Sequence, residues 1–229
     1  THWLRGISAT VLYIFVVIYV SSQIDATGIA FESMLDMNYY HGAILGFLIV
    51  LVYIFIGGFV AVVWSDLFQG VLMFLGLVAL PIVAWLSMDI GDGIVPELHK
   101  IDPSLTSIWG GQNDIVLNIA TILGFAAIGL GFLGSPQVYV RFMSIKNEAE
   151  ITKGSKVAII FTFLTDFAAV SIGILARLFF TEVGQDPETI LGIGGADVLG
   201  MMTEYFLPLV LTAIYVAIIL SAIMSTIDS

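Results

Sequence analysis

The sequence contains no cysteine, which excludes disulfide bonds and thiolate-bound metal sites anywhere in its 229 residues. Charge is also scarce: 11% of the residues are charged, 7 of them Lys or Arg and 18 Asp or Glu. A soluble domain has about one quarter charged residues, so this composition argues against an ordinary soluble fold. So few basic residues, with no basic patch among them, argue against nucleic acid as a partner.

Signatures of catalysis and metal binding are missing as well. His2, His41 and His99 have no metal-ligand spacing, and no H-E-x-x-H, P-loop or nucleophile–base motif occurs. Gly129-x-Gly131-x-x-Gly134 has the spacing of the dinucleotide fingerprint, but that motif requires a strand before it and a soluble unit around it. These glycines lie in an apolar run of membrane length. We therefore expect a protein that is not an enzyme.

What the sequence has in abundance is hydrophobic residues, at 59% of the chain, with a mean hydropathy of +1.06. They gather in apolar runs near the ~20 residues that a membrane-spanning helix needs. This pattern predicts an all-α, multi-pass protein in the lipid bilayer, with about six transmembrane helices. The predicted spans are residues 4–22, 41–64, 67–88, 114–134, 157–180 and 208–229.

The placement of Lys and Arg predicts the orientation of these spans. Arg5 and the basic segment 141–156 fall on one side, together with Thr1 and the brief break at Ser65-Asp66. We expect that side to be cytoplasmic and the membrane to be the plasma or inner membrane. The chain opens without Met or a signal-peptide pattern and closes inside an apolar run. Residues 1–229 are therefore expected to be a single transmembrane domain, incomplete at both ends.

The fourth predicted span contains an unusual density of helix-breaking residues. Gly129, Gly131, Gly134, Ser135 and Pro136 crowd its second half, and proline both lacks the N–H of a helical turn and clashes with it. Within hydrocarbon, broken backbone survives only where protein buries it or where it lines a cavity. Transporters use such breaks to direct helix ends toward ions and substrate. A binding site is therefore predicted here.

Three stretches in this order resemble the sodium:solute symporter family, specifically its sodium/proline symporter branch. They are YIFIGGFVAVVWSDLFQ at 53–69, GFLGSP at 131–136 with RFM at 141–143, and LSAIMST at 220–226. The resemblance implies a LeuT-type inverted-repeat core of ten helices, of which this chain would form core helices three to eight. It also implies Na⁺-coupled symport of a small organic solute, an amino acid such as proline. Because symporter-like domains also occur fused to signalling modules, a membrane sensor is the alternative.

For the ion, the resemblance assigns Ala222, Ser225 and Thr226 to a sodium site. Na⁺ is a hard cation that takes oxygen ligands, and two hydroxyls with a helix carbonyl would supply them. The alternative is that Ser225 and Thr226 only donate hydrogen bonds to the carbonyls one turn earlier.

For the solute, the resemblance implicates Tyr19, Ile128 and Phe132, together with the break at Gly134-Ser135-Pro136. Without the resemblance, Tyr19 would be read as an aromatic residue of the membrane interface. The proline branch has Trp and Tyr where this chain has Ile128 and Phe132. The departure weakens the case for proline itself, and packing is the alternative role for both residues.

Asp66 permits two interpretations. It opens the third predicted span and Gln69 follows it by three residues, as in a helix cap. The resemblance instead implies a second cation or proton site, completed at the positions of two family serines, which are Asp228 and Ser229 in this chain, so that one serine is replaced by a second carboxylate. The carboxyl group of Asp166, in the middle of the fifth span, is left without a role.

Overall fold

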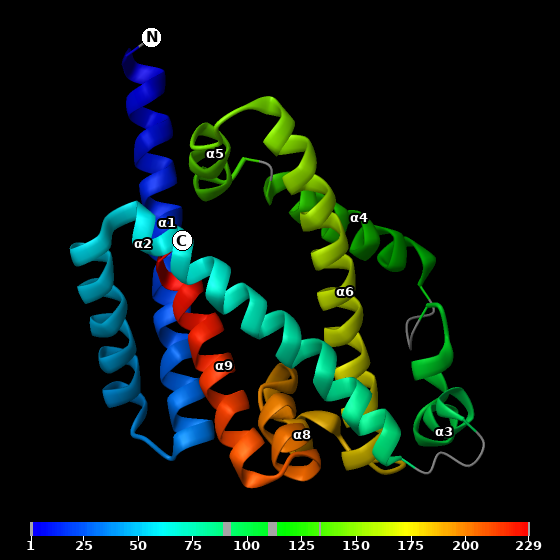
Figure 1. The fold of residues 1–229 in the computed structure, drawn as a ribbon. Coiled ribbons are helices and arrows are strands. Elements are labelled where there is room, and N and C mark those ends of the chain that lie inside the picture. The colour runs from blue at the N-terminus through cyan, green and yellow to red at the C-terminus, as the bar shows by residue number, and fades with distance from the viewer. Residues whose placement is uncertain (1, 89–92, 110–113, 133, 229) are drawn as a thin grey trace. The chain divides into compact units, whose positions relative to one another are not determined.

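The computed structural model describes residues 2–88, 93–109, 114–132 and 134–228, and these ranges contain helices but no β-strand (Figure 1). Five of the described helices are long and apolar enough to cross a bilayer. The predicted all-α membrane fold is therefore confirmed. The helices are α1 (His2–Leu35), α2 (Tyr39–Ser87), α3 (Ile94–Ile101), η1 (Pro103–Thr106), α4 (Ile115–Phe132), α5 (Pro136–Met143), α6 (Glu148–Phe180), α7 (Pro187–Leu191), η2 (Ile193–Gly195), α8 (Val198–Phe206) and α9 (Leu209–Asp228).

The chain divides into two compact units, and each is described by itself. The first unit comprises Thr1–Leu80 and Leu199–Ser229, and the second comprises Pro81–Val198. In the first unit, α9 (red in Figure 1) packs along α1 (blue), so the last helix of the chain lies beside the first.

Glycines allow α1 and α2 to approach each other closely within the first unit. A Cβ atom on Gly46 would lie 2.4 Å from Cγ2 of Thr27, and one on Gly42 would lie 2.5 Å from Cβ of Phe31. Thr27 is fully buried and Phe31 is buried. Small residues at such positions let the backbones of membrane helices come together. The close contact between α1 and α2 therefore depends on the absence of a side chain at Gly42 and Gly46.

The largest departure from the sequence-based expectation is in α2. We expected two spans separated at Ser65-Asp66, but the chain is helical through both residues. The only interruption lies at Gly58, whose φ of 55° and ψ of −151° suit glycine alone. Figure 1 shows the resulting turn near the α2 label. At ~1.5 Å per residue the arms 39–57 and 59–87 are about 28 and 43 Å long. The second arm exceeds a ~30 Å hydrocarbon core, and the first is close to the ~20 residues that a membrane span needs.

The second unit contains the polar connection between α2 and α4. Asp102 precedes η1, and its carboxylate Oδ1 accepts a hydrogen bond from the Ser104 N–H at 2.8 Å. This hydrogen bond, aided by the positive charge of Arg177 on α6, lowers the pKa of Asp102 below its ordinary value. On α3, Lys100 pairs with Glu97 at 2.5 Å. Helix α3 contacts α6, which anchors the connection on a long helix.

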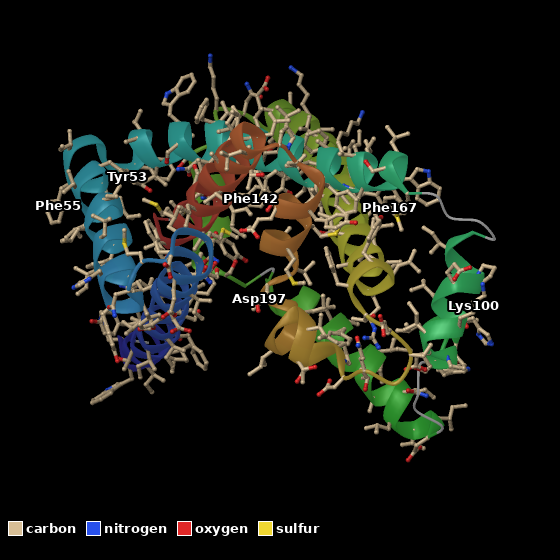
Figure 2. The ribbon with its side chains drawn as sticks, turned by 90° about the horizontal axis from the view of Figure 1, so that it is seen from below. Tyr53, Phe55, Lys100, Phe142, Phe167 and Asp197 are labelled. Carbon is tan, nitrogen blue, oxygen red and sulfur yellow. The ribbon has the colours of Figure 1, made fainter. Side chains whose placement is uncertain are left out.

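Large apolar side chains cover the outside of the helices. Phe55 on α2 is 81% exposed and Phe167 on α6 is 67% exposed, and both are labelled in Figure 2. Exposed aromatic residues in such numbers would be unfavourable in water but suit a lipid-facing surface. The exposure agrees with a membrane environment.

Candidate functional site

The predicted site residues Asp66 and Ser225 meet between α2 and α9. The hydroxyl of Ser225 donates a hydrogen bond to Oδ1 of Asp66 at 3.1 Å, across 159 positions of sequence. Both side chains are half-buried. The structure therefore joins the residue proposed for a second cation site to a residue proposed for the sodium site.

A second contact gives the relative direction of the two helices. A Cβ atom on Gly76 would lie 3.3 Å from Cε2 of Tyr215, so the tyrosine ring packs against this glycine. Gly76 follows Asp66 by ten residues, and Tyr215 precedes Ser225 by ten residues. The second arm of α2 and helix α9 are therefore antiparallel neighbours. We refer to the contact defined by these four residues as the α2–α9 seam.

The position of Asp66 in α2 excludes the helix-cap interpretation. A capping carboxylate accepts from the unpaired N–H groups of a first turn, but helix already runs from residue 59 to Asp66. Asp66 lies about 12 Å along the helix from Gly58, at ~1.5 Å per residue. A carboxylate inside a membrane-spanning helix is costly and is a functional candidate by default. The cap interpretation assumed that a helix begins at Asp66, whereas the helix begins earlier.

The two hydroxyls assigned to the sodium site differ in their hydrogen bonds. Thr226 donates to the carbonyl oxygen of Ala222 at 3.1 Å, which is the local bond that the alternative interpretation expects. Ser225 instead donates across the seam to Asp66. The side chain of Asp228 and the whole of Ser229 lie outside the described residues, so their part in a second cation site stays a prediction.

The oxygens at this seam suit a cation of low charge. Among the described residues, no group of three or more His, Cys, Asp or Glu gathers into a metal-binding cluster. The seam instead combines one carboxylate with hydroxyl and carbonyl oxygens. Hard cations take oxygen ligands, and the number of charged ligands tunes their affinity. Within the described residues, this single carboxylate with neutral oxygens fits a monovalent ion better than a divalent one.

The predicted break in the fourth span is present. Helix α4 ends at Phe132 and α5 begins at Pro136, with Ser135 extended between them at φ −73° and ψ 133°. The Gly134 N–H donates to the Gly131 carbonyl at 3.0 Å. The Ser135 hydroxyl is buried, and it has no hydrogen-bond partner among the described residues. Proline at the first helical position explains why α5 restarts there.

The other polar or solute-site residues that the sequence analysis singled out are more exposed than Asp66 and Ser225. Tyr19 on α1 is 40% exposed, Ile128 on α4 is 69% exposed, and Asp166 on α6 is exposed. Nothing is described of the Phe132 side chain, which lies outside the described part of the structure. Solute-binding roles for Tyr19, Ile128 and Phe132 stay predictions.

Two polar atoms at the seam were missed by the sequence analysis. The amide Oε1 of Gln69 and the hydroxyl of Tyr215 are buried, with no hydrogen-bond partner among the described residues. Tyr215 as a whole is 6% exposed. The polar residue at position 69 inside an apolar run could have indicated a buried polar group. The sequence analysis instead used Gln69 as support for a helix cap at Asp66.

Comparison with known proteins points to one family. The model of the sodium:solute symporter family matches residues 1–229. The high-affinity proline transporter PutP of Bacillus subtilis is 34% identical over 232 residues, which cover 100% of this chain and 46% of that protein. The sodium/proline symporter 2 of Staphylococcus saprophyticus is 32% identical over 231 residues, covering 100% of this chain and 42% of that protein.

A third relative, the osmoregulated proline transporter OpuE of Bacillus subtilis, is 33% identical over 232 residues, covering 99% of this chain and 44% of that protein. No solved structure gives a significant match. The chain thus spans less than half the length of these relatives. Because the family model matches every residue from 1 to 229, the chain belongs to the sodium:solute symporter family.

Proposed function

We propose that the full-length protein couples the inward flow of Na⁺ to the uptake of a small organic solute, with a proline-like amino acid as the first candidate. Family membership and the names of three relatives, each a proline transporter or sodium/proline symporter, support this proposal. The observation that carries it is the hydrogen bond between Ser225 and Asp66, which joins a carboxylate and a hydroxyl inside two apolar helices. Such a polar pair in a membrane-spanning segment is expected on an ion path.

The proposed sodium site consists of Ala222, Ser225 and Thr226 near the end of α9. The Thr226 hydroxyl lies 3.1 Å from the Ala222 carbonyl oxygen, so two potential ligand oxygens already converge on one side of the helix. A hydroxyl that donates its proton keeps lone pairs for a cation. Asp66, with Asp228 and Ser229, would form the second cation or proton site beside it.

The proposed solute site uses Tyr19 and the broken helix around Gly134, Ser135 and Pro136. The break frees backbone groups and directs the start of α5, as transporters do at their substrate sites. Ile128 and Phe132 precede the break on α4. Since they replace the Trp and Tyr of the proline branch, the pocket they line would lack an indole N–H and a phenol hydroxyl. A solute other than proline is compatible with that change.

The proposed architecture is that of core helices three to eight in a LeuT-type inverted repeat. Alternating access in such a core comes from the movement of one helix bundle against another around a fixed site. The Thr1 end and the basic segment 141–156 would face the cytoplasm, because that arrangement places Arg5 and most lysines inside. Ser65-Asp66, which the sequence analysis expected as a connection on that side, lies within α2, and the turn at Gly58 would take its place there. No observation on the described residues favours the sensor alternative.

Transport by the full-length protein in liposomes tests the proposal. Radiolabelled proline and a panel of other small amino acids would be offered with an inward Na⁺ gradient, and in parallel with choline replacing Na⁺. We expect at least one solute to accumulate only when Na⁺ is outside. Equal accumulation with choline, or no accumulation of any solute with Na⁺, would refute Na⁺-coupled uptake of these solutes.

A further inference from the structure

Helix α6 has a buried face and an exposed face. Its buried residues are Thr165, Ala168, Ile172, Leu175 and Ala176. Residues three or four positions apart lie on one side of an α-helix, so these five side chains share one face. The residues on the opposite face of α6 are therefore turned away from the second unit to which the helix belongs.

The exposed face of α6 begins with two lysines and continues with large apolar side chains. Its residues are Lys153, Lys156, Ile160, Phe163 and Phe167, which we call the α6 row. They follow one another at intervals of three or four positions, so they lie one above the other along the helix. The three apolar members are 61%, 70% and 67% exposed, and the last of them, Phe167, is labelled in Figure 2. The α6 row thus has a charged end and an apolar body.

The charged end of the row belongs to the basic segment of an otherwise acidic sequence. Four of the 7 Lys and Arg residues lie within 141–156, whereas the net charge of the sequence is −11. Lys153 pairs with Glu150 at 3.0 Å, and its side chain is still 73% exposed. An ammonium group has three donors, so Lys153 keeps donors for a second acceptor. Lys156 is exposed as well, so both lysines can reach a phosphate group from outside the helix.

The apolar body of the row has the length of one leaflet of the bilayer. Lys156 and Phe167 are eleven residues apart, which is about 17 Å along a helix at ~1.5 Å per residue. Half of a ~30 Å hydrocarbon core is about 15 Å. Apolar side chains exposed on a membrane-spanning helix suit contact with hydrocarbon. A lipid whose head group is level with Lys156 therefore has an acyl chain that ends near Phe167.

We propose that the α6 row binds one anionic phospholipid of the phosphatidylglycerol type. Its phosphate lies between Lys153 and Lys156. One of its acyl chains lies along Ile160, Phe163 and Phe167. Charge complementarity selects this lipid, because lysines at the membrane surface attract lipids with a net negative charge. The inference uses only the place of α6 in the membrane and does not depend on the solute or ion that is transported.

Native mass spectrometry of the full-length protein in detergent tests the site, because it resolves the first lipid that binds. Phosphatidylglycerol and phosphatidylcholine are titrated separately, and the wild type should bind phosphatidylglycerol more tightly. Lys156→Gln removes one charge, and we expect it to raise the Kd for phosphatidylglycerol about fivefold, the effect of one lysine near an anionic lipid. Lys156→Arg keeps the charge and should keep the affinity.

Lys146→Gln is the matched control, because it removes the same charge from the same basic segment. Lys146 is exposed but precedes α6, so it is not part of the row. We expect its affinity for phosphatidylglycerol to be that of the wild type. Phe163→Ala tests the apolar body, and it should weaken phosphatidylglycerol binding although both lysines remain.

Three results would overturn the inference. Equal losses in Lys146→Gln and Lys156→Gln would show that surface charge alone attracts the lipid. Equal affinities of the wild type for the two lipids would remove the basis for an anionic ligand. Wild-type affinity in both Lys156→Gln and Phe163→Ala would show that the lipid binds elsewhere and that another part of the full-length protein, or a second copy of it, covers the row. If Lys156→Gln cannot be purified in folded form, Lys153→Gln removes the other lysine of the phosphate site and should weaken binding in the same way.

Discussion

The turn in α2 yields a sharp test, because two glycines of one helix differ in backbone conformation alone. Gly58 has φ 55° and ψ −151°, whereas Gly70 lies in regular helix. A Cβ atom added at either position would meet nothing within 4 Å. Gly58→Ala and Gly70→Ala therefore differ in the strain of the backbone and in nothing that a side chain would touch.

The expected magnitudes follow from these conformations. A residue with a Cβ atom at the dihedral angles of Gly58 costs about 1–3 kcal/mol. Alanine replacing glycine in a helix interior is favourable by about 0.5–1 kcal/mol, so Gly70→Ala should be slightly stabilising. We expect the two variants to differ by about 1.5–4 kcal/mol in the free energy of unfolding.

Unfolding of the full-length protein in detergent, followed by heat and by added denaturant, measures this difference. Gly58→Ala should lower the unfolding midpoint below that of the wild type, and Gly70→Ala should leave it unchanged or raise it. If Gly58→Ala is as stable as Gly70→Ala, then the turn does not require glycine. The two arms of α2 would then have to join in a different conformation.

Three further predictions concern transport by the full-length protein. Ser225→Ala and Thr226→Ala each remove a proposed ligand oxygen and should raise the Na⁺ concentration for half-maximal uptake about tenfold; wild-type Na⁺ dependence in both would contradict the sodium site. Ile128→Trp combined with Phe132→Tyr restores the aromatic pair of the proline branch, so proline uptake should rise relative to that of other solutes. Unchanged selectivity in a variant that reaches the membrane would assign both residues to packing. Asp66→Asn keeps an acceptor for the Ser225 hydroxyl but removes the charge, so the Na⁺ dependence of uptake should change; a variant with the Na⁺ dependence of the wild type would leave the carboxylate a structural role only.

The parts of the fold that could be predicted depend on local chemistry. Apolar runs of sufficient length can only be satisfied as membrane-spanning helices, so their approximate places followed from hydropathy, although one helix, α2, covers two of the six predicted spans. The break before Pro136 was predictable because proline cannot continue a helix through Gly134 and Ser135. Such signals need no knowledge of the neighbouring helices.

The parts that could not be predicted depend on tertiary contacts. Ser65 and Asp66 looked like a surface break because they are polar residues in an apolar run. In the structure their polar groups are satisfied inside the membrane-spanning helix, since Ser65 donates to the Val62 carbonyl at 3.1 Å and Asp66 accepts from Ser225. The true turn at Gly58 was hidden because glycine permits unusual dihedral angles but does not require them.

The contact of Gly42 and Gly46 with α1 also constrains how this sequence can diverge. Every other amino acid carries a Cβ atom, so any single missense change at Gly46 drives an atom into Thr27, and any change at Gly42 drives one into Phe31. Selection should therefore tolerate replacement of these glycines chiefly when the opposite residue shrinks at the same time. Among homologues, we expect the residue at position 27 to become smaller wherever position 46 is not glycine.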